Sequence, residues 1–216
     1  MCLILLAWKT SREHPLVVAA NRDEFHARPA APAAFWEDHP GILAGRDLEA
    51  RGTWMGISRG GKFAAVTNYR GAREPRAAQS RGALVTGFLA NDESAGKYME
   101  LLNPKSYSGF NLVASDGNEL WWMSNRDGAQ RRLEPGIYGL ANLLLDSPDV
   151  EPRKRRFEAA LKVSVAAEPL FTLLAEARIV DPVYGTRCST VHFDGRYAER
   201  SFSPDGAEQE TVHYQL

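Results

Sequence analysis

The order of apolar segments predicts an α+β fold in which helices pack on antiparallel sheets. Short strand patterns occur in groups joined by tight turns, and two pairs of amphipathic helices separate these groups. Helices clustered between hairpins are typical of α+β proteins, whereas regularly alternating strands and helices indicate parallel sheets. The first two strand patterns are apolar throughout, as expected for a sheet that is covered on both faces. Two sheets packed face to face with the helices outside would explain this pattern.

The N-terminal hairpin is the segment around which we expect the rest of the chain to fold. Leu3–Trp8 and Leu16–Ala20 are continuous apolar runs, and a polar turn separates them. A hairpin made of two such strands returns the charged tetrapeptide Asn21–Glu24 to the position of Cys2. The sequence therefore predicts polar and charged groups beside the N-terminal thiol.

The remaining elements follow from periodicity and turn residues. Residues 28–40 are rich in Pro and Ala and predict irregular covering structure. Trp121 and Trp122 must point to opposite faces of their strand. Further strands are expected over Thr53–Ser58, Lys62–Asn68, Phe110–Ser115, Glu119–Ser124, Ile137–Asn142, Cys188–Phe193, Tyr197–Phe202 and Thr211–Tyr214. Helices are expected over Arg81–Ala90, Glu93–Leu102 (Tyr98, Leu101 and Leu102 inward), Pro152–Val163 and Glu168–Ala177.

Composition and charge indicate an ordinary globular protein. The 216 residues are 44% hydrophobic and 25% charged, and no linker-like segment divides them, so we expect a single domain over residues 1–216. A net charge of -1 argues against nucleic-acid partners. No apolar run approaches the roughly 20 residues that span a bilayer, so no stable membrane insertion is expected. The apolar N-terminus is short and lacks a basic leader, which favours a cytoplasmic location.

Cys2 and Cys188 are the two cysteines, and Cys2 has the chemistry of interest. A disulfide between them is one possibility, but sparse cysteine fits a reducing compartment better. If Met1 is removed, Cys2 carries both a nucleophilic thiol and a free α-amine that can accept its proton. The alternative is that Cys2 is a small buried hydrophobe and that the tetrapeptide is a surface turn.

Other motifs do not predict a different chemistry. The segment Gly56–Gly60 matches the G-x-S-x-G pattern, but a strand follows it where a serine hydrolase has a helix. The five histidines have no metal-ligand spacing, and no phosphate-binding glycine pattern occurs, so no metal or cofactor is expected. The basic run Arg153–Arg156 is expected to be the solvated end of a helix.

Several blocks taken together resemble the NRDE family, which is the family of transport and Golgi organisation protein 2. They keep the family order from end to end: Met1-Cys2, Ala19–Phe25, Gly52–Ile57, Ala65–Tyr69, Gly109–Leu112, Tyr138–Asn142 and Tyr184–Arg187. This family in turn is similar, more remotely, to the N-terminal-nucleophile hydrolases of the choloylglycine hydrolase and penicillin V acylase group. The resemblance implies a four-layer αββα sandwich.

The remote resemblance also implies a role for individual residues. Cys2 matches the nucleophile, Arg22 the arginine close to it, and Asp23 the carboxylate that binds the α-amine. Asn68 matches the oxyanion-hole asparagine, Asn142 a second asparagine that holds the amine or substrate, and Arg187 a late active-site arginine. We expect Asn21, Glu24 and Tyr69, which adjoin these positions, to bind substrate. Arg22 and Asp23 are adjacent here but separated by two residues in the hydrolases. On a strand, adjacent side chains point to opposite faces.

Two functions remain open from the sequence, and a purely structural role is a third, less favoured interpretation because polar residues recur at the same ends of apolar strands. The first is an N-terminal-cysteine hydrolase or acyltransferase that acts on a linear amide or thioester without a cofactor. The second is a non-catalytic protein that binds and carries haem or an acyl-lipid or acyl-CoA in the same groove, with haem as cargo. Both predict a small-molecule partner: an amide, a thioester or a haem-like ligand.

Overall fold

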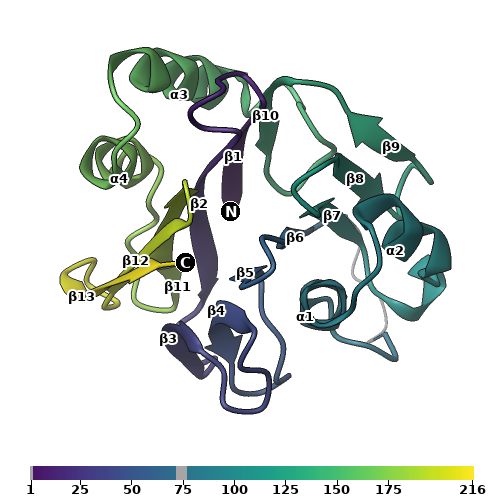
Figure 1. Ribbon diagram of the computed structural model, residues 1–216. Coiled ribbons are helices and arrows are strands. Elements are labelled where there is room, and N and C mark those ends of the chain that lie inside the picture. The colour runs from purple at the N-terminus through teal and green to yellow at the C-terminus, as the bar shows by residue number, and fades with distance from the viewer. Residues whose placement is uncertain (1, 72–76) are drawn as a thin grey trace. The chain divides into compact units, whose positions relative to one another are not determined.

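The chain packs as two compact units, which a computed structural model describes over residues 2–71 and 77–216. The first unit contains the residues up to Arg28 together with Pro135–Leu216, and the second contains Pro29–Glu134. Each unit has one antiparallel sheet and a small set of helices (Figure 1), so the predicted α+β class is confirmed. Met1 lies outside the described residues, and the single domain expected over residues 1–216 stays a prediction.

The sheet of the first unit has the strand order β10-β1-β2-β11-β12-β13, and all neighbouring strands are antiparallel. The strands are β1 (Leu3–Trp8), β2 (Leu16–Phe25), β10 (Gly136–Leu140), β11 (Tyr184–Phe193), β12 (Arg196–Phe202) and β13 (Glu208–Gln215). The predicted N-terminal hairpin is confirmed, because Leu3 lies opposite Asn21 and Trp8 opposite Leu16. β11 was expected to begin at Cys188. It begins earlier, at Tyr184, because Tyr184 already pairs with Phe25.

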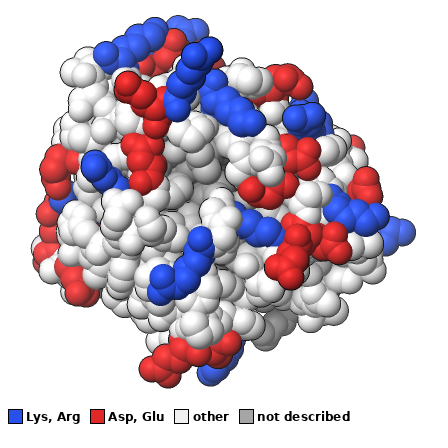
Figure 2. Space-filling view, in the orientation of Figure 1, with Lys and Arg blue, Asp and Glu red and all other residues white. Residues whose placement is uncertain are grey.

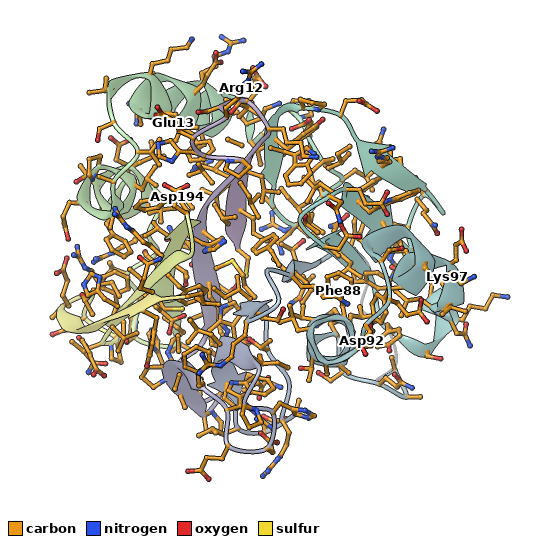
Figure 3. The ribbon with its side chains drawn as sticks, in the orientation of Figure 1. Arg12, Glu13, Phe88, Asp92, Lys97 and Asp194 are labelled. Atoms are coloured by element: carbon orange, nitrogen blue, oxygen red, sulfur yellow. The ribbon has the colours of Figure 1, made fainter. Side chains whose placement is uncertain are left out.

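Two helices, α3 (Glu151–Val163) and α4 (Ala167–Ala175), cover one face of this sheet. Leu3, Leu5 and Ala19 pack there with Phe157, Leu170 and Leu174 in one apolar cluster. Every residue of β1 is buried, as its continuous apolar pattern predicted. Arg12 and Glu13 lie in the loop that joins β1 to β2 (Figure 3), at the opposite end of the hairpin from Cys2. The helices thus hold the central strands that lead to Cys2.

The second unit has a seven-stranded sheet in the order β3-β4-β5-β6-β7-β8-β9. Its strands are β3 (Ala30–Phe35), β4 (Ile42–Asp47), β5 (Met55–Ser58), β6 (Phe63–Asn68), β7 (Phe110–Ser115), β8 (Leu120–Ser124) and β9 (Gln130–Leu133). Helices α1 (Gly82–Ala90) and α2 (Ala95–Leu101) and a 3₁₀ turn (Pro104–Ser106) complete the unit. The predicted β5–β6 hairpin is confirmed, which also confirms that a strand follows the G-x-S-x-G pattern.

Three details of the second unit differ from the prediction. Residues 28–40 were expected to be irregular, but Ala30–Phe35 forms an edge strand with an irregularity between Ala31 and Ala34. A proline is tolerated at such a site because an edge strand has donors that need no ladder partner. Leu101 was expected to face inward but is 63% exposed. Strands β4 and β9 were not predicted.

The side chains of the second unit otherwise follow the predicted faces. Trp122 is buried and Trp121 is half-buried, and they lie on opposite faces of β8 as expected. Phe88 of α1 is buried in the core, whereas Lys97 of α2 extends toward solvent (Figure 3). Among the helices that the structure describes, none has the length and apolarity needed to cross a membrane.

Candidate active site at the end of the N-terminal hairpin

Cys2 lies at the start of the buried strand β1, between residues of two neighbouring strands. Leu3 pairs with Asn21, so continuing the register by one residue places Cys2 opposite Arg22 of β2. On the other side of β1, Ile4 pairs with Leu140, the last residue of β10, so Asn142 follows just after the end of the strand that neighbours β1. The sheet therefore places Cys2 beside Arg22, although the two are far apart in the sequence.

Cys2 and Arg22 share the face of the sheet that is turned away from α3 and α4. Leu3 packs into the helix-facing cluster, and the Asn21 side chain donates a hydrogen bond to the carbonyl of Leu174 at 2.9 Å. Since side chains alternate along a strand, the neighbours of Leu3 and Asn21 point to the other face. Asp23 then lies on the helix-facing side with Asn21, so Arg22 and Asp23 do lie on opposite faces.

The Cys2 thiol is half-buried, and its nearest hydrogen-bond acceptor is a backbone oxygen. Sγ donates to the carbonyl oxygen of Asp23 at 3.5 Å, and the Tyr184 hydroxyl donates to the same oxygen at 3.2 Å. Burial, and then the negative charge of Asp23, raise the pKa of the Cys2 thiol, while Arg22 lowers it by less. The thiol is therefore held in its protonated form, and a nearby base is needed to activate it.

The Asp23 carboxylate is fixed by a threonine on the neighbouring strand. The hydroxyl of Thr186 donates to Oδ1 of Asp23 at 2.6 Å, and the amide of Ile179 donates to the Thr186 hydroxyl at 2.8 Å. Both side chains are buried. A hydrogen bond of this length holds the carboxylate in one orientation.

Arg22 and Glu24 form a looser arrangement. Arg22 is 6% exposed, and its Nη2 lies 3.7 Å from Oε2 of Glu24. The same Glu24 oxygen is 3.9 Å from Nε of Arg28, and the other oxygen accepts the amide of Phe25 at 2.9 Å. Because the contacts are long and Glu24 is partly solvated, this carboxylate is able to exchange partners at little energetic cost.

Arg187 holds the segment that follows β2. Its Nη1 donates to the carbonyl oxygens of Phe25 at 3.0 Å, His26 at 3.3 Å and Arg28 at 3.0 Å. Burial and the positive charge of Arg22 lower the pKa of Arg187, so the two guanidiniums share one region. This geometry gives Arg187 a role in positioning the end of β2, and its catalytic role stays a prediction.

Asn21 is held within the sheet rather than directed into open space. It is buried, its Nδ2 bonds the Leu174 carbonyl, and its Oδ1 accepts the Ser189 hydroxyl at 2.7 Å. These bonds tie β2 to α4 and to β11. The predicted contact of Asn21 with substrate therefore competes with two buried hydrogen bonds that stabilise the fold.

Two of the predicted residues belong to the second unit. Asn68 ends β6, where it pairs with Phe110, and the amide of Tyr69 donates to the Gly109 carbonyl at 3.0 Å. Their expected roles beside Cys2 stay predictions. Among the residues that the structure describes, no group of three or more His, Cys, Asp or Glu is placed to hold a metal ion.

Cys188 lies on the other side of β2 from Cys2. It pairs with Arg22, and both cysteines are free thiols. Two strands that flank a third are roughly 10 Å apart, whereas a disulfide requires Cα atoms within about 7 Å. The disulfide left open by the sequence is therefore absent, and the geometry of the sheet explains why.

The family of the chain follows from its sequence relatives. The family model described as Transport and Golgi organisation 2 matches residues 1–182. This chain belongs to the Transport and Golgi organisation 2 family. The homologue from Bos taurus is 40% identical over 163 residues, which is 68% of this chain and 59% of that protein. The Drosophila melanogaster protein is 32% identical over 185 residues, which is 75% of this chain and 65% of the relative.

This member of the Transport and Golgi organisation 2 family spans less than two thirds of the length of those relatives. The family placement confirms the resemblance inferred from the NRDE blocks.

Solved structures with little sequence identity have the same fold. The C2A mutant of conjugated bile acid hydrolase from Clostridium perfringens aligns with a TM-score of 0.61 at 11% identity, covering 100% of this chain and 97% of that one. Penicillin V acylase from Agrobacterium tumefaciens aligns with a TM-score of 0.53 at 13% identity, covering 100% and 86%. The Caenorhabditis elegans ortholog of N-acylethanolamine-hydrolyzing acid amidase aligns with a TM-score of 0.54 at 11% identity, covering 88% and 92%. The predicted fold of N-terminal-nucleophile hydrolases is thereby confirmed for this family member.

Sequence reasoning missed two residues that touch the site. Tyr184 and Thr186 both bond Asp23, one at its backbone and one at its carboxylate. They belong to the block Tyr184–Arg187, from which only Arg187 was assigned a role. Because Tyr184 and Thr186 lie on the same strand as Arg187, a predicted contact of Arg187 with β2 was the available indication that these two residues also contact β2.

Proposed function

We propose that this chain is a Cys2-dependent hydrolase or acyltransferase that acts on a linear amide or a thioester. The observation that carries the proposal is the placement of Cys2 at the start of β1 beside Arg22 of β2, with its thiol donating to the Asp23 carbonyl. The solved hydrolase that shares the fold was crystallised as its C2A mutant, so a cysteine at position 2 is natural to that enzyme. The fold likeness and this placement together support a nucleophilic role for Cys2.

The proposed reaction begins with removal of Met1, which frees the α-amine of Cys2. The amine takes the thiol proton, and the thiolate attacks the substrate carbonyl carbon to form a C–S bond and an oxyanion. By the resemblance, Asn68 donates to that oxyanion, and Asn142 holds the amine or the substrate. The C–N or C–S bond of the leaving group breaks, and the leaving group receives the proton from the ammonium. Water or an acceptor then cleaves the acyl thioester and restores the thiol.

The raised pKa of the Cys2 thiol makes the amine essential to this proposal. A thiol that burial keeps protonated is a weak nucleophile until a base removes its proton. The chain must therefore begin at Cys2 in its active form. Intact mass spectrometry of the purified protein measures this directly, with the mass of the chain lacking Met1 as the expected result.

The chemical test uses Cys188→Ala, which leaves Cys2 as the single thiol. Incubation with an activated acyl donor, such as p-nitrophenyl hexanoate, is expected to add one acyl group to Cys2 and then release it as the acid. Cys2→Ala is the matched variant and is expected to gain no adduct. A mature chain that retains Met1, with Cys2 unreactive toward both iodoacetamide and the acyl donor, contradicts the proposal.

A second candidate function is binding and transport of haem or an acyl-lipid through the same residues. The close arginines Arg22, Arg28 and Arg187 favour it, since guanidinium groups bind carboxylates and phosphates. The relatives are named for transport and Golgi organisation, which agrees with a role in trafficking. Titration with haem is expected to give a saturable Soret shift that Cys2→Ala weakens. Absence of saturable binding removes the haem version.

A further inference from the structure

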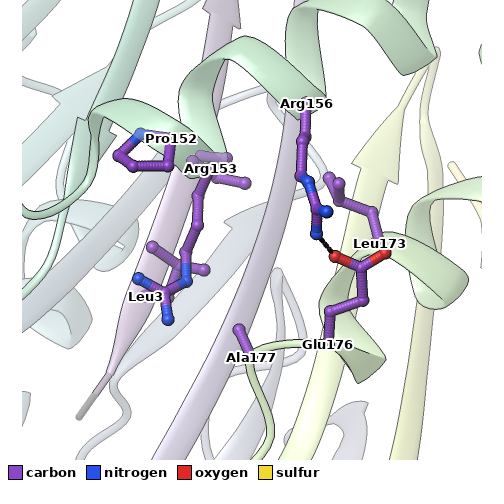
Figure 4. A pocket seen from close by; sticks show the side chains of 8 residues that line it. Leu3, Pro152, Arg153, Arg156, Leu173, Glu176 and Ala177 are labelled. Carbon is purple, nitrogen blue, oxygen red and sulfur yellow. Dashed lines mark ion pairs between the residues drawn. The ribbon is translucent and has the colours of Figure 1, made fainter.

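A cavity of about 230 Å³ lies in the first unit between α3, α4 and β1 (Figure 4). It opens on the helix-covered side of the sheet, whereas Cys2 and Arg22 face the other side. Leu3 and Leu5 of β1 line it from the sheet, and residues of the two helices form its walls. The cavity is therefore separate from the candidate active site, although Leu3 adjoins Cys2 in the chain.

The inner part of this cavity is aliphatic. Leu3 and Leu5 are two residues apart on a strand, so both point toward the helices, and Leu173 and Ala177 face them from α4 and the residues after it. No polar side chain interrupts these four lining residues. Leu3 and Leu5 are almost fully buried, whereas Leu173 and Ala177 are half-buried. An aliphatic chain would therefore gain free energy chiefly by removing the surface of Leu173 and Ala177 from water.

The rim of the cavity is cationic. Arg153 and Arg156 are three residues apart on α3 and therefore lie on one face of the helix. Figure 4 shows Arg153 extending toward Leu3, while Arg156 forms an ion pair with Glu176. The two arginines and Glu176 leave one net positive charge at the rim. A ligand with one negative charge matches this balance.

The other two members of the basic run are engaged elsewhere. Lys154 forms ion pairs with Asp146 at 2.8 Å and Glu151 at 3.6 Å, and Arg155 pairs with Glu151 at 3.1 Å. The space-filling view shows basic and acidic side chains intermixed over α3 (Figure 2). In the run that was expected to be only a solvated helix end, Lys154 and Arg155 therefore pair away from the cavity, whereas Arg153 and Arg156 border it. Arg156 pairs there with Glu176, and Nη1 of Arg153 donates to the Asp149 carbonyl at 3.5 Å.

We propose that this cavity binds a short aliphatic carboxylate. Its carboxylate would receive two parallel N–H donors from Arg153, and its chain would lie along Leu3, Leu5 and Leu173. A cavity of about 230 Å³ has room for a short ligand of this kind. Binding at this site does not depend on any reaction at Cys2.

The test is a titration of the full chain with sodium hexanoate, observed by the methyl signals of isotopically labelled leucine. Leu3, Leu5 and Leu173 are expected to shift together along one saturable curve, while Leu112 of the second unit stays unchanged. Arg153→Gln is expected to weaken hexanoate about tenfold, which corresponds to about 1.4 kcal/mol. Arg155→Gln, on the same helix but paired away from the cavity, is expected to bind within twofold of the natural chain.

Three controls keep the proposal open to refutation. 1-Hexanol, which has the same chain without the charge, is expected to bind at least tenfold more weakly than hexanoate. Leu173→Trp fills the cavity and is expected to abolish binding while the two arginines remain. Cys2→Ala is expected to bind hexanoate normally, so a failure of the proposed reaction and a failure of this site give different results. Equal loss in Arg153→Gln and Arg155→Gln, equal binding of hexanol, or no shift of the three leucines overturns the proposal.

Discussion

The two faces of β2 near its end differ in how tightly their side chains are held. On the helix-facing side, Asn21 makes two buried hydrogen bonds, and Asp23 accepts the Thr186 hydroxyl at 2.6 Å. On the other side, the Cys2 thiol has an acceptor at 3.5 Å, and Arg22 has a carboxylate at 3.7 Å. Successive residues of the tetrapeptide Asn21–Glu24 thus have different roles. Alternate residues anchor the strand through short hydrogen bonds, and the opposite face carries a thiol and a guanidinium whose contacts with Asp23 and Glu24 are longer.

The largest expected effect is on the anchoring face, in Asn21→Ala. This change leaves the buried Leu174 carbonyl and the Ser189 hydroxyl without their partner, so we expect the free energy of unfolding to fall by about 3 kcal/mol. Urea unfolding measures the change. Cys2→Ala, on the other face, is expected to cost about 1 kcal/mol or less. Equal losses in the two variants would break the comparison.

Thr186→Val tests the second anchor. It removes the hydroxyl that joins Ile179 to the Asp23 carboxylate, and we expect a loss of about 2 kcal/mol because the bond involves a charged acceptor. Thr186→Ser keeps the hydroxyl and is expected to lose less than about 1 kcal/mol. Thermal unfolding of both variants at the same pH decides the matter, and similar melting temperatures for the two would show that the hydroxyl is unimportant.

A smaller effect is expected in the reactivity of the Cys2 thiol. Its pKa is raised above the ordinary value of 9.0, so the rate of alkylation by iodoacetamide should still be rising with pH at pH 9. Asp23→Asn removes a negative charge that disfavours the thiolate, so the pKa falls and alkylation at pH 7.5 should become about threefold faster. The parent protein and the Asp23→Asn variant both carry Cys188→Ala, so that only alkylation of Cys2 is measured. A slower reaction in Asp23→Asn would contradict the prediction that the Asp23 charge raises the pKa of the Cys2 thiol.

The smallest effect is expected for Glu24→Gln. Its ion pairs with Arg22 and Arg28 are long and partly solvated, so the free energy of unfolding should change by less than about 0.5 kcal/mol. Urea unfolding beside Asn21→Ala gives the contrast. A loss above about 2 kcal/mol would place Glu24 among the anchors and sharpen the division between the two faces.

The sequence predicted the part of this arrangement that depends on local pattern. Two apolar runs of similar length define the hairpin, and its register places Cys2 opposite Arg22. Adjacent residues on a strand alternate, so the separation of Arg22 from Asp23 was also predictable. The edge strand β3 was missed because prolines and alanines in residues 28–40 lack the β-branched and aromatic residues that are typical of strands.

The sequence did not predict the contacts that come from distant strands. Thr186 reaches Asp23 across 163 residues, and Leu174 reaches Asn21 across 153. No local periodicity specifies that β11 pairs with β2, because that pairing depends on how the whole sheet assembles. Only the resemblance to a known family predicted roles for Arg187 and Asn142, and it predicted none for Tyr184 and Thr186.

The position of β2 between the two cysteines limits how the molecule responds to oxidants. A thiol that is oxidised to a sulfenic acid is usually rescued by a second thiol close enough to form a disulfide with it. Cys188 is the other cysteine of the chain, and it is separated from Cys2 by a full strand. Within the part of the chain that the structure describes, an oxidised Cys2 therefore has no resolving thiol within reach. Its return to the reduced form depends on a small thiol or a reductase that approaches from solution.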